Sequence, residues 1–319
     1  EIGAFLINSY YLIAENDGLS GVINLSNEVV QPFVYEEIVL EELRQHYIFS
    51  VDGKWGVFNF QMEVAIEPIY DYIEYQPERF TYTIDSTYRE FIMPQFIIER
   101  NGLFGLCDTT GRIIVPAEYE SVNMIRNQRA VQCYYRPQFY GVLKNDKSGI
   151  CKEGGKQVIP PEYNQVYYHA WRNEKCTDSI REYGIATNWV KKTNTSQVFN
   201  LNTEVTTDPH NIIIPFEDYF IFADDDLSGI LGPDLKVIRG DIPYVLNFDL
   251  DVAREYQANS LLASDSVLFT FPFMDKKSRK KSKNNYIGAR NKRGLINFHT
   301  GRTIPIKYDE VYIQRDGKE

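Results

Sequence analysis

A glycine-centred pattern recurs along the 319 residues of this chain, and it constrains the fold more than any single residue does. From the glycine, each copy continues with two apolar or cysteine residues. The well-kept copies reach a proline eleven or twelve residues later and a tyrosine fourteen residues later. The copies start at Gly21, Gly56, Gly105, Gly149, Gly229 and Gly294; the Gly229 copy is the weakest, with its tyrosine one residue late. A repeat spacing of about 40 residues is typical of solenoids, propellers and other arrays.

The copy around Gly56 shows what one repeat encodes. The run HYIFSVDGKWGVFNF is rich in β-branched and aromatic residues and is broken by Asp52-Gly53, which predicts two strands joined by a tight turn. The following run, EVAIEPIY, contains a proline that cannot donate to a ladder, so this strand must end, bulge or lie at an edge. We expect Gly56 to lie across this second hairpin from Tyr70, with the ring covering the glycine; an unrelated core tyrosine is the alternative.

The same residues resemble the WG-repeat family of bacterial proteins, which is named for a Trp-Gly pair followed by a turn, a proline and a tyrosine. Only the copy GKWGVFNF keeps the tryptophan, as Trp55. The Pro-x-x-Tyr tail is kept better, as in VPAEYESV, PPEYNQV and IPIKYDEV. The resemblance extends over nearly the whole chain, and it implies an all-β repeat domain. It implies no particular biochemical activity.

One copy of about 25 residues cannot bury a core alone, so neighbouring copies must stack. We therefore expect a single domain over residues 1–319, including a degenerate copy in which Gln197 replaces the glycine. The predicted fold is an all-β array of six to seven antiparallel three- or four-stranded units, like a β-propeller, with an open twisted β-solenoid as the alternative. The repeats are expected at approximately 19–42, 53–75, 102–125, 146–169, 195–215, 226–250 and 292–314.

The charge and hydropathy of the chain narrow the classes of partner. A formal net charge of −10 argues against general binding of nucleic acid or of anionic membranes. The sequence contains no apolar run of the length that spans a bilayer, about 18 residues. The chain begins at Glu1 without a methionine, so a signal peptide or anchor could have been removed, and the sequence leaves both a cytoplasmic and an exported location open.

The candidate metal, cofactor and catalytic residues are better explained by their positions in the repeat. Cys107 and Cys151 share the position two residues after the glycine, where other copies have Ile, Phe or Leu, so we interpret them as core residues. The spacing of the cysteines and histidines fits no zinc site, and a disulfide between Cys133 and Cys176 is conceivable only in an oxidising compartment. We expect no metal, no cofactor and no catalytic residues.

One acidic stretch imitates the first half of a calcium loop. It contains Asp224, Asp226 and Ser228, but its twelfth position is Leu235 where a bidentate glutamate is required. The same stretch corresponds to the turn before the repeat glycine, equivalent to Asp52-Gly53. We therefore interpret it as a repeat turn.

The strongest functional signal is the irregularity of the array. Long insertions follow the tyrosines of several copies, at what we expect to be corresponding connections, so they should emerge on one face or rim. Aromatic residues there would supply contact area, and one lysine-rich run would attract an acidic partner, phosphate or RNA backbone. Ordinary solvated loops are the alternative. The candidate partner-binding residues are Tyr134, Tyr135, Tyr168, Trp171, Lys276, Lys277, Arg279, Lys280 and Lys281.

Two functions from different classes follow from this reading. The favoured function is a non-enzymatic β-repeat scaffold or binding module that contacts another protein, or a surface ligand, through its insertion loops. The alternative is a carbohydrate-binding module or a hydrolase with its site in the channel or rim of the array. The partner and the oligomeric state are not encoded in any pattern of the sequence.

Overall fold

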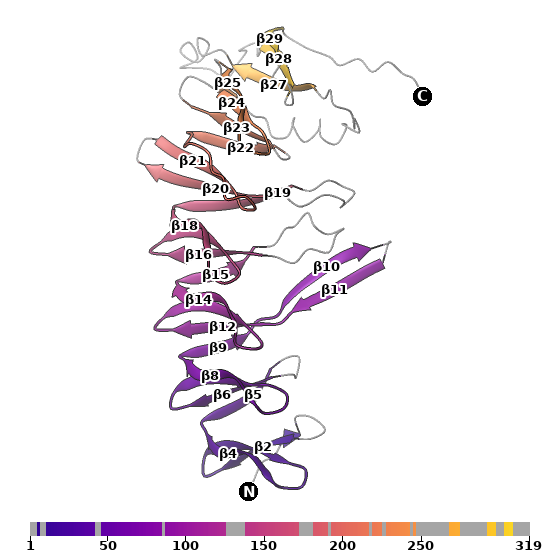
Figure 1. Cartoon of the computed structure of the whole chain (residues 1–319), viewed down its shortest axis with the longest axis vertical. Helices are drawn as coiled ribbons and strands as arrows, with labels where there is room; N and C mark the ends of the chain where they lie inside the picture. Colours follow the sequence, from indigo (N-terminus) through magenta and orange to yellow (C-terminus); the bar gives the residue numbers. More distant parts are fainter. Residues whose placement is uncertain are drawn as a thin grey trace, which may run out of the picture. The chain divides into compact units, whose positions relative to one another are not determined.

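A computed structural model of the chain consists of β-strands joined by turns and loops (Figure 1). No helix occurs among the residues that the structure describes, so the prediction of an all-β fold is confirmed. The described residues are 5–6, 11–41, 46–84, 87–125, 138–171, 181–190, 193–216, 219–224, 228–242, 245–246, 268–274, 292–297 and 303–308.

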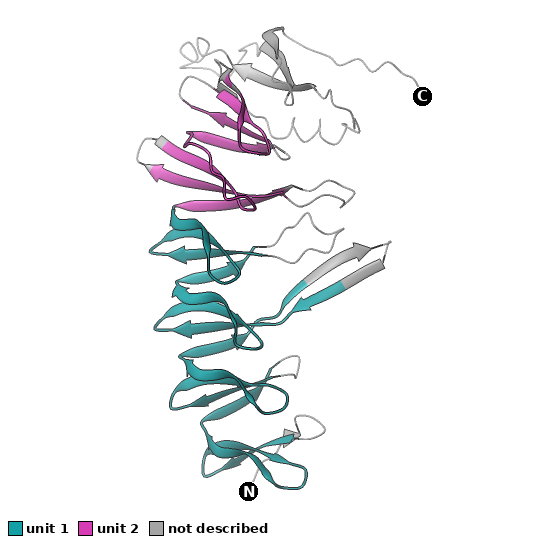
Figure 2. Ribbon diagram, viewed as in Figure 1, with its two compact units in different colours: residues 1–163 teal, residues 164–319 magenta. Residues whose placement is uncertain are grey.

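The chain divides into two compact units, residues 1–163 and residues 164–319, which are called unit 1 and unit 2 (Figure 2). The single domain expected from the repeat period stays a prediction.

Unit 1 contains four sheets, each with four antiparallel strands. Sheet 1 comprises β1 (Phe5–Leu6), β2 (Tyr11–Asn16), β3 (Leu19–Asn24) and β4 (Val29–Tyr35). Sheet 2 comprises β5 (Glu37–Leu40), β6 (Tyr47–Val51), β7 (Lys54–Phe58) and β8 (Val64–Tyr70). Sheet 3 comprises β9 (Tyr72–Tyr75), β12 (Gln95–Arg100), β13 (Leu103–Asp108) and β14 (Ile113–Tyr119). Sheet 4 comprises β15 (Ser121–Met124), β16 (Phe139–Lys144), β17 (Lys147–Lys152) and β18 (Gln157–Tyr163).

A separate two-stranded ribbon, β10 (Glu78–Ile84) and β11 (Thr87–Met93), is inserted into sheet 3 between β9 and β12.

Unit 2 continues the same plan. Sheet 5 has three strands: β19 (Gln165–Trp171), β20 (Arg181–Val190) and β21 (Thr193–Asn200). Sheet 6 comprises β22 (Ile212–Phe216), β23 (Tyr219–Ala223), β24 (Ser228–Leu231) and β25 (Val237–Ile242). Sheet 7 comprises β26 (Val245–Leu246), β27 (Leu268–Met274), β28 (Lys292–Asn297) and β29 (Thr303–Tyr308). The predicted antiparallel units of three or four strands are thus confirmed, and in the described residues every sheet is open.

The hydrophobic core lies between consecutive sheets. One buried cluster joins Val22 of sheet 1 to Phe49 and Phe58 of sheet 2. Further clusters join sheet 2 to sheet 3 and sheet 3 to sheet 4, and in unit 2 a cluster joins sheet 5 to sheet 6. Both faces of a middle sheet are therefore covered, which explains why Tyr47, Ile48 and Phe49 are all buried although neighbours on a strand point to opposite faces.

Tight turns join the second and third strands of the sheets in unit 1. Asp52 and Gly53 have φ angles of 50° and 65°, and Asn101 and Gly102 have φ angles of 55° and 75°. Positive φ at both central residues is the requirement of the hairpin turns whose twist matches that of the strands. The turn predicted at Asp52-Gly53 is confirmed.

The repeat glycine lies opposite a β-bulge in the fourth strand. In sheet 3, Phe104 pairs with Tyr119 and Leu106 pairs with Val115, so Gly105 alone faces the three residues between them on β14. A Cβ on Gly105 would lie 2.5 Å from the backbone oxygen of Val115, closer than real side chains come. The register is the same around Gly21, Gly56, Gly149 and Gly294. The repeat proline lies within each of these bulges, on an edge strand, as its missing N–H group predicted.

The expected contact between Gly56 and Tyr70 is wrong. Because the bulge adds residues to β8, Tyr70 pairs with Trp55, the residue before the glycine. Gly56 is instead directly opposite Phe49 of β6, and a Cβ on the glycine would lie 2.7 Å from that ring. An aromatic ring does cover the glycine, but it comes from the other neighbouring strand.

The residue after the tyrosine links each sheet of unit 1 to the next. The chain passes between sheets through a single residue, and its side chain accepts hydrogen bonds from the tight turn of the following sheet. Asp71 Oδ2 accepts from Asn101 N at 2.6 Å, and Glu120 Oε1 accepts from Asn145 N at 2.7 Å. Glu36 Oε1 accepts from Gly53 N, the second residue of its turn, at 3.1 Å. An acidic residue at this position thus holds the turn.

Candidate interaction surface

The predicted insertions occupy the connection between the first and second strands of a sheet. In unit 1 these connections run from β5 to β6, from β9 to β12 and from β15 to β16, and the strand ends that they join lie on one rim (Figure 2). We call this the insertion rim. The tight turns between the second and third strands lie on the opposite rim. The expectation of corresponding connections fails for the lysine-rich run, because that segment follows β27 and precedes β28, the second and third strands of sheet 7.

The ribbon of β10 and β11 is the insertion that the structure describes most fully (Figure 1). Its two strands pair without a bulge from Glu78 opposite Met93 to Ile84 opposite Thr87. Arg79 and Glu90 form an ion pair across it, with 3.6 Å between Nη1 and Oε1. No third strand joins the ribbon among the described residues, so both of its strands are edge strands.

Tyr168 is the candidate residue whose side chain the structure places. Its hydroxyl donates to Glu182 Oε1 at 2.6 Å. Asn202 Nδ2 donates to the other oxygen, Glu182 Oε2, at 3.1 Å, and Glu182 is only 3% exposed. Tyr168 therefore supports a buried carboxylate near the connection from β19 to β20, and Glu182 serves the structure of sheet 5.

The other candidate residues are not placed in this way. Trp171 ends β19 and pairs through its backbone with Arg181, but its side chain lies outside the description. The rest lie outside the described residues and stay predictions: Tyr134, Tyr135, Lys276, Lys277, Arg279, Lys280 and Lys281.

A histidine-carboxylate pair that the sequence did not indicate closes the connection from β5 to β6. Glu41 Oε1 accepts a hydrogen bond from His46 N at 3.1 Å, and Glu41 N donates to His46 O at 3.1 Å. The His46 ring packs edge-to-face on Phe96 of sheet 3, with 5.7 Å between centroids. Burial lowers the pKa of His46, although Glu41 opposes the shift, so the ring is neutral near pH 7. The pair closes a loop, and the neutral His46 ring has a structural role there.

The cysteines and the calcium-like stretch have structural roles where they are described. Cys107 and Cys151 are buried free thiols, as expected, and burial raises the pKa of each to about 12. Asp224 Oδ1 accepts from Asn211 N at 3.0 Å, and its other oxygen lies 3.0 Å from His210 Nδ1. The described residues contain no cluster of His, Cys, Asp or Glu that could hold a metal ion. Cys133, Cys176 and Asp226 lie outside the description.

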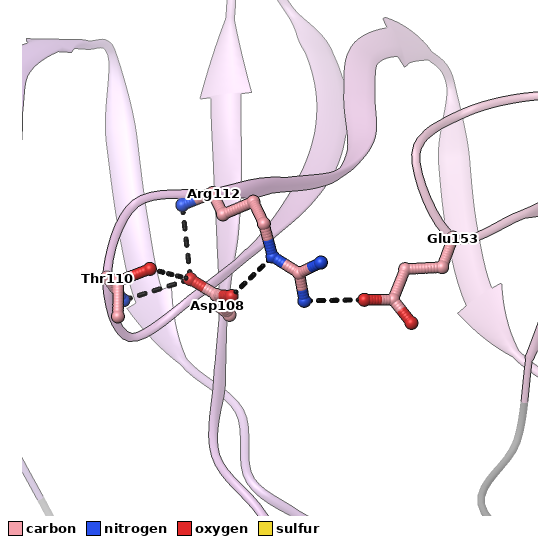
Figure 3. Close-up of polar contacts among 4 residues, drawn as sticks. All are labelled: Asp108, Thr110, Arg112 and Glu153. Atoms are coloured by element: carbon pink, nitrogen blue, oxygen red, sulfur yellow. Dashed lines mark hydrogen bonds and ion pairs between the residues drawn. The ribbon is translucent and has the colours of Figure 1, made fainter.

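An ion pair joins the turn before β14 in sheet 3 to the turn before β18 in sheet 4 (Figure 3). Asp108 Oδ1 accepts hydrogen bonds from Thr110 and from Arg112 N, and Arg112 Nη2 reaches Glu153 Oε1 in sheet 4 at 2.6 Å. Burial raises the pKa of Asp108, but the hydrogen bonds from Thr110 and Arg112 outweigh it and the net shift is downward. Polar residues at these turns therefore hold adjacent sheets together.

Comparison with known proteins identifies the repeat. The family model described as "WG containing repeat" matches residues 47–75 and 104–131. Residues 47–75 and 104–131 of this chain are therefore WG repeats. The match confirms the resemblance inferred from Trp55, Gly56 and the Pro-x-x-Tyr tail. The first matched WG repeat covers the second, third and fourth strands of sheet 2 and the first strand of sheet 3.

Other comparisons add little to the WG-repeat assignment. No curated protein matches the chain. Among solved structures, the dihydro-heme d1 dehydrogenase NirN in complex with DHE is 10% identical, with a TM-score of 0.27 over 96% of this chain and 66% of that one. A eukaryotic initiation factor is 9% identical, with a TM-score of 0.24 over 96% of this chain and 87% of that one. The WD40 domain of SCAP from fission yeast is 8% identical, with a TM-score of 0.20 over 77% and 56%. At these TM-scores the likenesses carry no argument about activity.

The described part of the WG-repeat chain holds no helix that is both long enough and apolar enough to cross a bilayer.

Proposed function

We propose that this chain is a non-enzymatic WG-repeat scaffold that binds another protein through the insertion rim. The observation that carries the proposal is the ribbon of β10 and β11, which extends from the rim with no third strand in the described residues. Extended peptides add to such free edges through main-chain hydrogen bonds, and side-chain contacts then provide specificity. The repeat sheets supply a rigid base, which is how binding loops are commonly presented.

The ribbon can be removed without opening sheet 3, which makes the proposal testable. Gln76 N donates to Gln95 O at 3.0 Å where the ribbon leaves the sheet. Replacing residues 77–94 with Asn-Gly would close β9 and β12 with a two-residue turn of the favoured type. The matched control is Asp146→Gly, which alters the tight turn between β16 and β17 on the opposite rim.

Partners captured from cells of the source organism by the wild-type chain would be identified by mass spectrometry and then purified. We expect the ribbon-deletion variant to lose direct binding to the purified partner, while Asp146→Gly keeps it. Both variants should unfold within a few degrees of the wild type. Equal binding by all three proteins would contradict the proposal, and turnover of a polysaccharide panel by the purified chain would favour the hydrolase instead.

A further inference from the structure

The fourth strands of sheets 1 and 2, and the turns that precede them, expose large apolar side chains. Between 37% and 62% of each residue is exposed. We call the set the edge patch: Leu25, Val29 and Val34 of sheet 1, and Phe60, Val64 and Ile69 of sheet 2. Isolated exposed apolar residues are ordinary, but a group on adjoining elements indicates a site of interaction.

The two halves of the edge patch adjoin each other. Gln31 on β4 donates from Nε2 to the backbone oxygen of Met62 at 2.7 Å, so the turn of sheet 2 lies against the fourth strand of sheet 1. Met62 also shares a buried cluster with Val22 of sheet 1. The turn that contains Phe60 therefore lies beside β4, which brings the two halves of the edge patch next to each other.

Sheets 3 and 4 show that the fold does not require apolar residues there. The positions equivalent to Leu25 and Phe60 are Thr109 and Glu153, and those equivalent to Val34 and Ile69 are Glu118 and Glu162. The position of Val29 and Val64 is Ile113 in sheet 3 but Gln157 in sheet 4. Because the same strands and turns form with polar residues, folding does not explain why these positions are apolar in sheets 1 and 2.

The negative charge of the chain around the edge patch favours a positively charged partner. Residues 1–75 contain 13 acidic and two basic residues, a net charge of −11, whereas the remaining residues contain 31 acidic and 32 basic residues. Exposed Glu28 and Glu63 each precede a patch valine, and the equivalent residues of sheets 3 and 4 are Arg112 and Lys156. A surface of this kind favours a cationic partner and accelerates its encounter.

The geometry of the fourth strands decides how such a partner binds. β4 and β8 are edge strands, but each carries a proline and a bulge, which are features that prevent another strand from pairing with an edge. Contact must then come from side chains, as when an amphipathic helix places its apolar residues on a hydrophobic surface. We propose that the edge patch binds a basic amphipathic helix of a partner protein, independently of the ribbon of β10 and β11.

The test uses synthetic peptides of about 18 residues, five helical turns, with leucines on one face and lysines elsewhere. One control peptide has the same composition in an order without an apolar face, and a second has glutamate in place of lysine. We expect saturable binding of the Leu/Lys peptide to the full chain, with an affinity that falls as salt rises, and at least about tenfold weaker binding of both controls.

The variant Val34→Glu/Ile69→Glu adopts the residues that sheets 3 and 4 carry, so it should fold, and its added negative charge would strengthen a purely electrostatic complex. We expect it to bind the Leu/Lys peptide at least about tenfold more weakly than the wild type. The matched control Val205→Glu/Val237→Glu changes two exposed valines of unit 2, at 47% and 59% exposure, and should bind like the wild type.

Several results would overturn the proposal: no measurable binding of the Leu/Lys peptide, equal binding of the scrambled peptide, or equal loss of binding in both double variants. So would sedimentation showing that Val34→Glu/Ile69→Glu turns a wild-type oligomer into a monomer, because a second copy would then cover the patch. The ribbon-deletion variant should bind the peptide normally, which separates this test from that of the ribbon.

Discussion

Sheet 3 and sheet 5 differ at the one residue that defines the repeat. Sheet 3 has Gly105, four strands and a bulge in β14 that presses on the glycine. Sheet 5 has Gln197 at the equivalent position, three strands, and two isolated bridges, Ser196 with His210 and Phe199 with Thr206, in place of a fourth strand. The difference indicates that the glycine is needed because of the bulge. Where the fourth strand is incomplete, the long side chain of Gln197 fits at the equivalent position.

The segment after β21 nevertheless remains attached to sheet 5, through main-chain hydrogen bonds such as Thr207 N to Val198 O at 3.0 Å and through side chains. Gln197 Nε2 donates to Thr207 O at 3.0 Å, and Val198 N donates to Thr207 Oγ1 at 3.1 Å. Val198 is fully buried, like Leu106 at the matching position of sheet 3. Amide and hydroxyl groups thus supplement a shortened main-chain pairing where the glycine, proline and tyrosine pattern is incomplete.

The largest expected effect that separates the two sheets is the loss of the repeat tyrosine. Tyr119 is 1% exposed and belongs to the core between sheets 3 and 4. Tyr119→Ala should lower the free energy of unfolding by about 3 to 5 kcal/mol, as removal of a buried aromatic side chain usually does. His210→Ala, at the corresponding ladder position of sheet 5, should cost about 1 to 2 kcal/mol. Urea unfolding checks both, and equal losses would remove the distinction between the sheets.

A smaller effect should appear at Thr207, whose side chain supplements the main-chain bonds between this segment and β21. Thr207→Val keeps the shape of a residue that is 7% exposed but leaves the buried Val198 N–H without its acceptor. The expected loss is about 1 to 3 kcal/mol in the free energy of unfolding. Thr207→Ser keeps the hydroxyl and serves as the control in the same urea titration. If the serine variant were as unstable as the valine variant, packing and not the hydrogen bond would hold this segment.

The smallest effect concerns acid, because a carboxylate holds the turn of sheet 3 whereas an amide holds the end of β20 in sheet 5. Hydrogen bonds from Lys54 and from Asn101 N lower the pKa of Asp71. In sheet 5, Asn164 Oδ1 accepts from Trp189 N at 2.9 Å and does not titrate. The contribution of Asp71 is complete above its unfolded pKa, about 3.9, and disappears as the pH falls through its lower folded pKa.

Amide hydrogen exchange, corrected for its intrinsic pH dependence, measures this contrast. As the pH falls from about 6 through the lowered pKa of Asp71, the Asn101 amide should lose protection while the Trp189 amide keeps it. The variant Asp71→Asn should remove the pH dependence at Asn101. Parallel loss of protection at both amides would mean that global unfolding, and not the carboxylate, controls exchange.

The local elements could be predicted from the sequence because their signals are local. Asp52-Gly53 specifies a turn because these residue types tolerate positive φ angles. A proline near the end of a strand specifies a break in the ladder because it has no N–H group to donate. The size of the bulge has no such signal, which is why the prediction paired Gly56 with Tyr70. The residue after the tyrosine was missed although a signal existed, since Glu36, Asp71 and Glu120 are all acidic.

The residues of the candidate interaction surface were less predictable than the strands and turns of the repeat. The chain position of an insertion follows from the repeat, but the inward hydrogen bond of Tyr168 to Glu182 depends on a strand 14 residues further along. His46 and Glu41 meet only because both flank one connection, and no spacing rule distinguishes them from other pairs. The edge patch could not be predicted from the sequence, because an exposed valine and a buried valine are identical there.

The central claim is that the repeat glycine is required by the bulge that presses on it. It is tested most directly by the urea midpoints of the single variants Gly56→Ala, Gly105→Ala and Gly149→Ala, where a Cβ would lie 2.5 to 2.7 Å from backbone oxygens. The control is Gly141→Ala, in the second strand of sheet 4, where the nearest atom is 3.7 Å away. The account predicts losses of about 2 to 3 kcal/mol at the three repeat glycines and little change at Gly141. Stability within about 0.5 kcal/mol of the wild type in all four variants would contradict it.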